Sequence, residues 1–220
     1  MTRAGTKLWA LLWTAQLQFF IVYEVVASAW QVPFDWKRNA ISDLAAAECY
    51  TSQGDGHPVC SPWHLAMGGS FLLTGALMAA GALLAPGALF GKAAKSLLAV
   101  GGIGFLIVGL TPRLSDSGLH MTGALLTMVF GNIGLLLAGW SARRSFRAAG
   151  LAAALCGLVA LIATATMVVT QLIWVIPPGP DTAWALSWFG LIERIVVYPT
   201  IVGMIVLGAG ALVPERRTGR

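Results

Sequence analysis

Six long apolar runs constrain the fold more than any other feature of this chain. They cover residues 8–30, 62–84, 94–110, 119–140, 148–176 and 188–213. A transmembrane helix needs roughly 20 mostly apolar residues to cross a hydrocarbon core of about 30 Å. Helix-ending sequences such as Pro86-Gly87 and Thr111-Pro112 fall in the gaps between the runs. The sequence therefore predicts an all-α, integral membrane bundle of six transmembrane helices, formed as one domain by residues 1–220.

Composition supports the membrane class and argues against a nucleic-acid partner. Hydrophobic residues make up 57% of the chain and charged residues only 10%, whereas soluble domains carry about 25% charged residues. The net charge of +5 could favour nucleic acid, but most Lys and Arg residues lie in short segments between the apolar runs, a pattern typical of membrane topology. We expect the lipid bilayer, and no nucleic acid, as a partner.

The Lys and Arg residues also predict the orientation. Three of the fourteen lie on one side (Lys37, Arg38 and Arg113), and Arg194 lies inside the sixth run. The other ten lie on the opposite side: Arg3, Lys7, Lys92, Lys95, Arg143, Arg144, Arg147, Arg216, Arg217 and Arg220. Loops rich in Lys and Arg stay in the cytoplasm. We therefore expect a multi-pass protein of the cell membrane with both termini cytoplasmic.

The first run has an alternative interpretation as a signal peptide. Ala27-Ser28-Ala29 resembles a signal-peptidase site. However, the run is about 22 residues long, more than the 7–15 of a signal-peptide core, and it contains Gln16, Gln18 and Glu24. A retained transmembrane helix is the favoured interpretation.

Residues 31–61 form the one long loop, predicted to lie on the outer side. Cys49 and Cys60 both lie in it, and a disulfide between them would restrain this loop by about 2–3 kcal/mol. A metal site at His57, Cys60 and His64 is the alternative, but this spacing matches no common zinc pattern. We predict no metal and no cofactor.

The same loop contains a predicted short helix. Asn39 or Ser42 can cap it, and Asp43 would lie in its first turn. Because Trp30, Phe34 and Trp36 are close by, we expect an interfacial helix on the outer surface that covers the bundle as a lid. A plain amphipathic connector is the alternative interpretation.

Two short motifs carry a family resemblance. The sequence Asn39-Ala-Ile-Ser-Asp-Leu44 is followed by Cys60-Ser-Pro-Trp-His64 at the start of the second helix. Together they resemble a bacterial family of six-helix membrane proteins that is known mainly as a domain of unknown function. The resemblance covers nearly the whole chain. It implies the fold and gives little guidance on chemistry.

Ionisable residues inside the apolar runs are the candidates for function. A charge near the bilayer centre costs about 2.5–3.5 kcal/mol on insertion scales, so such residues usually face the bundle interior and find partners. We expect Arg194 to pair with Glu24 or Asp116, which leaves Glu193 at the rim of a cavity. The expected polar layer at this depth comprises Glu24, His64, Arg113, Asp116, His120, Gln171, Glu193 and Arg194. Either a functional cavity or a network that only fixes the helices would explain it.

The first functional hypothesis is a membrane enzyme acting on a lipophilic, isoprenoid-like substrate. A carboxyl group in an apolar pocket can act as a general acid, and aromatic faces stabilise cations. Glu24 and Glu193 are the first candidate proton donors and Asp43 the third, with His64, His120 and Arg194 orienting the acid. Predicted substrate contacts are Trp30, Trp63, Phe71, Arg113, Asp116, Gln171, Trp188 and Tyr198. Size and plan are similar to those of small bacterial membrane-bound terpene cyclases that start by protonation.

The second hypothesis is a non-enzymatic membrane protein, such as a small transporter, a lipid-binding protein or an assembly factor. The chain shows no clear inverted repeat, which argues against a transporter. Proton-coupled transport through Glu24 and Glu193 stays open. The chain also lacks a phosphate-binding loop, His-Glu-x-x-His and Gly-x-Ser-x-Gly.

Overall fold

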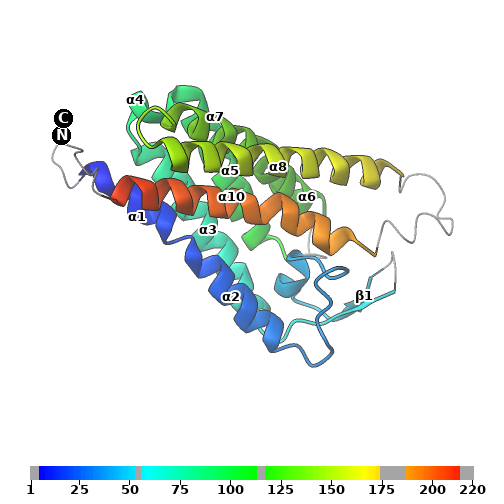
Figure 1. The fold of residues 1–220 in the computed structure, drawn as a ribbon. Coiled ribbons are helices and arrows are strands. Elements are labelled where there is room, and N and C mark those ends of the chain that lie inside the picture. The colour runs from blue at the N-terminus through cyan, green and yellow to red at the C-terminus, as the bar shows by residue number, and fades with distance from the viewer. Residues whose placement is uncertain (1–4, 53–55, 113–116, 174–186, 214–220) are drawn as a thin grey trace, which may run out of the picture.

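The computed structural model describes residues 5–52, 56–112, 117–173 and 187–213. Within these ranges, six helices are long and apolar enough to cross a membrane. They are Lys7–Ser28, His64–Leu84, Lys92–Leu110, Gly118–Ala142, Arg147–Val169 and Phe189–Leu212. Each coincides with one of the predicted apolar runs, so the six-helix membrane bundle is confirmed (Figure 1).

Several of these spans are built from more than one element. The first consists of α1 (Gly5–Thr14) and α2 (Leu17–Ser28), and the fourth of α6 (Ser117–Leu125), the π-helix η2 (Leu126–Gly131) and α7 (Asn132–Ala142). The others are α3 (His64–Leu84), α5 (Lys92–Leu110), α8 (Arg147–Ile173) and α10 (Phe189–Leu212). The connections contain the 3-10 helix η1 (Ser42–Ala45), β1 (Tyr50–Thr51), β2 (Pro58–Val59) and the one-turn helix α4 (Gly87–Phe90).

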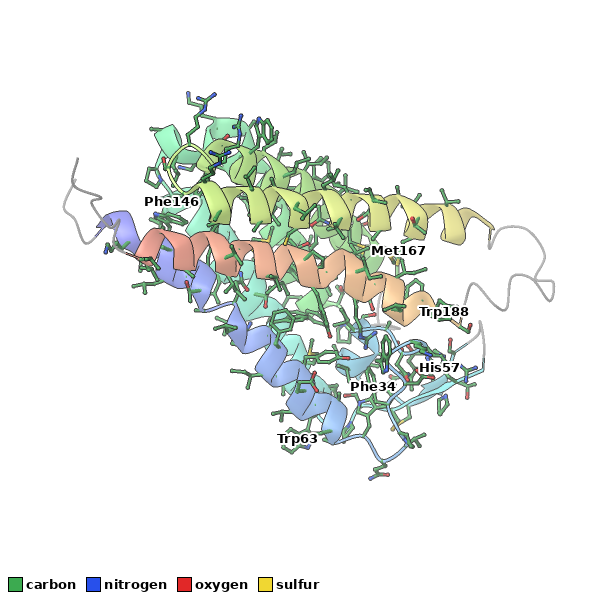
Figure 2. All side chains as sticks on the ribbon, viewed as in Figure 1. Phe34, His57, Trp63, Phe146, Met167 and Trp188 are labelled. Carbon is green, nitrogen blue, oxygen red and sulfur yellow. A yellow bond between two sulfur atoms is a disulfide. The ribbon has the colours of Figure 1, made fainter. Side chains whose placement is uncertain are left out.

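The bundle has two distinct ends. Helix α1 begins and α10 ends at the end that also carries α4, and we call it the terminal end (Figure 1). The long loop and its two strands lie at the opposite end, which we call the loop end. Figure 2 shows His57 and Trp188 at the loop end and Phe146 at the terminal end. Which end faces the cytoplasm stays the prediction made from the Lys and Arg count.

Buried polar residues mark the break between α1 and α2. Gln16 is fully buried there, and its Nε2 donates to the carbonyl oxygen of Thr74 at 3.1 Å. The Nε2 of Gln18 donates to the Thr74 hydroxyl at 2.8 Å. In lipid, polar groups must find partners inside the protein. These glutamines therefore connect the first span to α3.

Helices α3 and α5 approach each other through glycines. A Cβ atom placed on Gly75 would lie 2.5 Å from the carbonyl oxygen of Gly102, closer than a side chain tolerates. Small residues allow this contact between helix backbones, which is a common basis of helix association in lipid.

The π-helix η2 joins the fourth span to its neighbours. The carbonyl oxygen of Met128 accepts hydrogen bonds from Asn132 Nδ2 at 2.8 Å and from Thr164 Oγ1 at 3.3 Å. The Thr200 hydroxyl of α10 donates in turn to Asn132 Oδ1. Such π-turns occur often at functional sites, and this one borders the cavity described below.

The structure corrects the prediction of an interfacial helix in the long loop. The segment concerned, residues 39–46, is here called the plug segment. It is buried along its whole length, and only Ser42–Ala45 forms a single 3-10 turn. The apolar side chains of Ile41 and Leu44 pack into the hydrophobic core. The segment thus fills the loop end of the bundle. Its Asp43 carboxylate and the carbonyl oxygens of Asn39 and Leu44 accept hydrogen bonds from protein groups, whereas the buried Nδ2 of Asn39 has no partner among the described residues.

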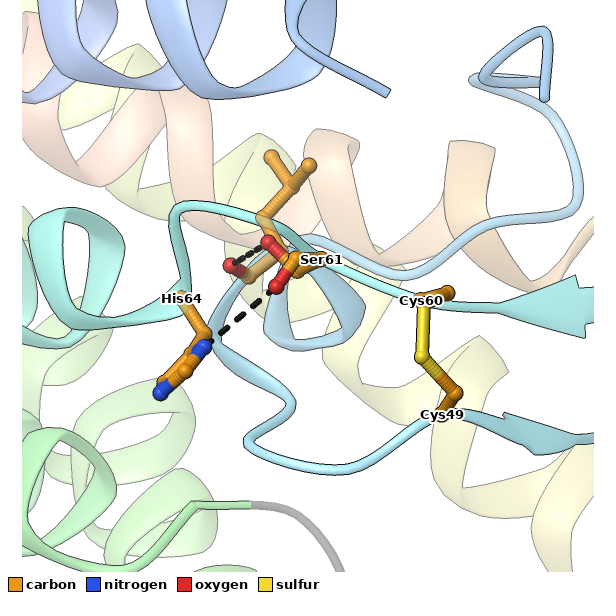
Figure 3. Close-up of a disulfide and its surroundings, with 5 residues drawn as sticks. Cys49, Cys60, Ser61 and His64 are labelled. Atoms are coloured by element: carbon orange, nitrogen blue, oxygen red, sulfur yellow. Dashed lines mark hydrogen bonds between the residues drawn. A yellow bond between two sulfur atoms is a disulfide. The ribbon is translucent and has the colours of Figure 1, made fainter. Parts of the chain in front are cut away.

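The Cys49–Cys60 disulfide is present, as predicted. Figure 3 shows it beside the two short strands, with Ser61 and His64 following Cys60. Strands β1 and β2 pair antiparallel, with Tyr50 opposite Val59. Because Cys60 is in the disulfide, it is not available for the alternative metal site.

Candidate functional site

The first turns of α10 bind the backbone of the plug segment and of Lys37 just before it. The Leu191 amide donates to the carbonyl oxygen of Lys37 at 3.1 Å. The Arg194 guanidinium donates to the carbonyl oxygen of Asn39 at 2.8 Å. The Ile41 amide donates to the Glu193 carboxyl group. Two adjacent charged residues of one helix therefore bind the same short stretch of loop.

Arg194 is buried and makes hydrogen bonds to α2, to the plug segment and to its own helix. Its Nε and Nη2 donate to the Tyr23 hydroxyl at 3.0 and 2.7 Å, and its Nη1 also donates to the Gly190 carbonyl oxygen at 2.7 Å. The guanidinium carbon lies 5.4 Å from the centroids of the Tyr23 and Phe34 rings. The expected pairing with Glu24 is wrong, because Glu24 lies on the exposed side of α2. Asp116, the other expected partner, lies outside the described residues.

Asp43 is completely buried, but it faces the hairpin at the loop end. Its carboxylate accepts from the Ala40 amide at 2.8 Å and from the Tyr50 hydroxyl at 3.1 Å. His57 Nε2 lies 3.4 Å from the same carboxylate. Asp43 therefore folds the plug segment against the hairpin, and it is not among the residues that line the cavity.

A cavity of about 260 Å³ lies below the plug segment, between the fourth span, α8 and α10. Its lining is mostly apolar, with four polar residues. The lining residues are Ser42, His120, Met121, Ala124, Leu125, Met128, Thr164, Met167, Val168, Phe189 and Glu193. Glu193 and His120, both predicted, are each only 7% exposed. The structure therefore brings one acid and one imidazole to the same apolar space.

The cavity reaches the side of the bundle between α6 and α8. Met121 and Leu125 of α6 and Val168 of α8 line it and are also 44%, 44% and 39% exposed. On a membrane-spanning bundle, the flank of a helix contacts lipid. The apolar wall is thus continuous with the lipid-facing surface of these two helices.

His120 has a defined ring orientation. Its Nδ1 lies 2.7 Å from the carbonyl oxygen of Thr111, and because a carbonyl only accepts, Nδ1 carries the proton. In the neutral ring, Nε2 is then the proton acceptor.

A smaller cavity of about 30 Å³ adjoins the first and shares Ser42, His120 and Glu193 with it. Phe71, a predicted substrate contact, lines this smaller space together with Phe105 and Ile41. The polar trio thus lies between a larger space that reaches lipid and a small aromatic space inside the bundle.

The other predicted site residues lie elsewhere. His64 is half-buried, with Nδ1 3.3 Å from the Ser61 carbonyl oxygen (Figure 3). Trp63 is 52% exposed, and Trp30 lines a separate hollow beside the hairpin. The Lys37 ammonium lies 5.3 Å from the Trp188 ring centroid.

Tyr198 packs edge-to-face against Tyr23, with ring centroids 5.7 Å apart, and is not part of the cavity wall. Arg113 and Asp116 lie outside the described residues, as does the side chain of Gln171.

The sequence interpretation missed several cavity residues. The side chains of Thr164, Met167 and Val168 come from α8 and that of Phe189 from the start of α10. Thr164 and Met167 are three residues apart and therefore share a helix face. The polar Thr164 on this otherwise apolar face was the sequence signal that could have indicated the cavity wall.

Residues 15–210 match the family described as Protein of unknown function (DUF998). The chain belongs to this family. The expected membership of a six-helix membrane family of unknown function is thereby confirmed. The DUF998 range contains every residue that lines the two cavities. No curated protein and no solved structure matches the chain.

Proposed function

We propose that this protein is a membrane-embedded enzyme that performs acid–base chemistry on a lipophilic substrate. The observation that carries the proposal is that Glu193 and His120 both line one apolar cavity that reaches the lipid-facing surface. Ionisable side chains inside a membrane are costly and often mark functional sites. Here they border an empty space instead of a fully packed core.

Glu193 is the proposed proton donor. One oxygen of its carboxyl group accepts from the Ile41 amide, which fixes the orientation of the group. Arg194 holds Asn39, two residues before Ile41, so it acts as a positioning residue for this contact. His120, with Nδ1 protonated and bound to Thr111, is the proposed proton acceptor through Nε2.

The concrete reaction that we propose is cyclisation of an isoprenoid started by protonation. The O–H bond of the Glu193 carboxyl group breaks as its proton forms a C–H bond on one alkene carbon. A second alkene closes the ring, and the resulting cation loses a proton to His120 while the electron pair of that C–H bond forms a new double bond. Return of the proton from His120 to Glu193 restores the site, and the product keeps the formula of the substrate.

The cavity lining supports an unsaturated hydrocarbon chain as the substrate. Phe189 borders the larger space, and Phe71 and Phe105 border the smaller one, where aromatic faces can stabilise a cation. Met121, Met128 and Met167 supply flexible, polarisable walls. The volume of about 260 Å³ is slightly below the roughly 300–1,000 Å³ of sites for drug-sized ligands, which favours one slender chain. With the predicted orientation, the reaction would take place in the outer half of the cell membrane.

A lipid-binding protein without chemistry is the second candidate, because the same lateral opening would admit a lipid chain. The two candidates differ in what Glu193 must do. A binding site needs the shape and hydrogen bonds of the side chain, whereas an enzyme needs its transferable proton. Glu193→Gln keeps the shape and removes the acid.

The test compares lipid extracts of cells that express the wild type, Glu193→Gln or Glu24→Gln, by untargeted mass spectrometry. Glu24 is the matched control, since it is a second intramembrane carboxyl group but lies exposed on α2. We expect a lipophilic product of unchanged formula with the wild type and Glu24→Gln. With Glu193→Gln we expect a loss of about 100-fold or more, the size typical of removing a general acid.

Equal membrane expression and equal thermal unfolding of the three proteins are the required controls. An identical product level in Glu193→Gln would refute the role of the acid. If the wild type changes no lipophilic compound but co-purifies with one, the lipid-binding candidate replaces the enzyme.

A further inference from the structure

A second hollow lies at the terminal end of the bundle, far from the cavity. Its volume is about 260 Å³, and four of its nine lining residues are polar or charged. It is lined by the connection between α3 and α5 and by the turn between α7 and α8. The lining residues are Gly87, Ala88, Leu89, Gly91, Trp140, Ser141, Arg143, Arg144 and Ser145. Two arginines thus border one concave space at the membrane surface.

Arg143 is held in place before any ligand arrives. Its guanidinium carbon lies 3.7 Å from the centroid of the Trp140 ring, and its Nη1 donates to the Trp140 carbonyl oxygen at 2.5 Å. This bond uses one of the five N–H donors of a planar guanidinium. The others match the oxygens of a phosphate, and a stacked arginine loses little conformational freedom on binding.

The charges around the hollow favour an anion. Lys92 and Lys95 lie at the same end of the bundle, in the first turn of α5. The five acidic residues within the described ranges belong to the loop-end half: Glu24, Asp35, Asp43, Glu48 and Glu193. A ligand at the hollow therefore meets several positive charges and, among the described residues, no nearby carboxylate.

The position of the hollow at the end of a membrane span favours a lipid as its ligand. Trp140 is 53% exposed on the flank of α7 next to the end of the span, where Trp residues typically lie at the level of the headgroups. Leu89 adds an apolar wall beside the arginines. We propose that this hollow binds the phosphate of an anionic phospholipid, with Arg143 and Arg144 as the main donors. A soluble phosphate compound offers the same oxygens but has no acyl chain to place against Leu89.

The test measures the thermal unfolding midpoint of the purified full-length protein in a non-ionic detergent. The three titrants are short-chain phosphatidylglycerol, short-chain phosphatidylcholine and inorganic phosphate. A ligand that binds only the folded state raises the midpoint with concentration. Three variants are compared. The double variant carries both Arg143→Gln and Arg144→Gln, and the two single variants are Arg144→Gln and Arg147→Gln. The last is the matched control, an exposed arginine of the same turn that does not line the hollow.

We expect phosphatidylglycerol to raise the midpoint of the wild type and of Arg147→Gln more than the other two titrants do. The double variant should need about tenfold more phosphatidylglycerol for the same shift, as for the loss of strong charge-assisted hydrogen bonds. Arg144→Gln alone should need about threefold more, and this variant decides the question if the double variant does not fold.

Three results would overturn the proposal. One is a midpoint shift with phosphatidylcholine as large as that with phosphatidylglycerol. Another is a loss of response in Arg147→Gln as large as in the double variant, which would indicate that net positive charge alone attracts the lipid. The third is an equal shift with inorganic phosphate, which would assign the hollow to a soluble ligand and not to a lipid.

Discussion

Gly190 is the single residue on which the contact between α10 and the plug segment depends most directly. A Cβ atom at this position would overlap the carbonyl group of Asn39 and approach the carbonyl oxygen of Lys37. Both carbonyls accept hydrogen bonds from α10, through Arg194 and Leu191. The absence of a side chain at Gly190 therefore allows the loop backbone to lie on the helix.

Gly190→Ala should destabilise the folded protein by about 1–3 kcal/mol, because the added methyl group must push the loop away from α10. The measurement is the thermal unfolding midpoint in detergent. Gly69→Ala is the matched control, since a Cβ at Gly69 of α3 would meet no atom within 4 Å and Ala favours a helix over Gly. Equal midpoints for the two variants would contradict the overlap.

At the scale of single residues, the sequence predicted which residues belong to the site better than it predicted the groups that they contact. Glu193 and His120 were expected in one polar layer, and they line one cavity. The pairing of Arg194 with Glu24 was wrong, whereas Asp116, the other predicted partner, lies outside the described residues. Among the described residues, the acceptors of Arg194 are the Tyr23 hydroxyl and two backbone carbonyls. Every residue has a backbone carbonyl, so composition and spacing carry no signal for such a contact.

Among the elements, the disulfide-linked hairpin supports the plug segment from the loop end. The Ser61 hydroxyl, one residue after Cys60, donates to the carbonyl oxygen of Leu44 at 2.6 Å (Figure 3). The Tyr50 hydroxyl, one residue after Cys49, donates to Asp43. Each half-cystine therefore precedes a residue that holds the plug segment.

Replacing both Cys49 and Cys60 by Ser should loosen this part of the chain and leave the six spans folded. Closing a loop of about this length stabilises by about 2–3 kcal/mol. We expect faster cleavage within residues 47–61 by a non-specific protease, with unchanged helical content by circular dichroism. Cys156→Ser, outside the disulfide, is the control and should be cleaved at the wild-type rate. Cleavage at equal rates in all three proteins would show that the disulfide does not restrain the hairpin.

The elements themselves were predicted to different degrees. The six spans follow from hydropathy, because lipid permits few alternatives to a helix. The plug segment was misplaced, since its pattern of Ile41, Leu44 and nearby aromatic residues suits an interfacial helix and a buried turn equally. The deciding contacts come from α10, about 150 residues later in the chain, and local sequence does not specify them.

On the scale of the whole molecule, the two proposed sites lie at opposite ends of the bundle. The cavity with Glu193 and His120 lies under the plug segment, and the arginine-lined hollow lies near α4. This separation follows from the uneven distribution of charge: within the described ranges, most basic residues lie at the terminal end and the acidic residues lie at the loop end. The orientation of the bundle therefore decides which leaflet each proposed lipid comes from.

The ten-to-three count of Lys and Arg predicts that the terminal end is cytoplasmic. A test uses two single substitutions at exposed positions, Gln31→Cys at the loop end and Ala93→Cys at the terminal end, in a Cys156→Ser background. Neither substitution alters a charge, so the topology signal is kept. Intact cells treated with a membrane-impermeant maleimide should label Gln31→Cys and leave Ala93→Cys unlabelled until the membrane is opened.

The reverse labelling pattern would mean that the bundle has the opposite orientation in the membrane. It would also place the Cys49–Cys60 disulfide on the reducing side of the membrane, where disulfides are rare. The cavity would then open toward the inner leaflet, and the arginine-lined hollow would meet the outer leaflet. Anionic lipids concentrate in the cytoplasmic leaflet, so the proposed phospholipid site requires the predicted orientation. One labelling experiment thus tests the orientation predicted from the Lys and Arg count and the leaflet that each proposed site faces.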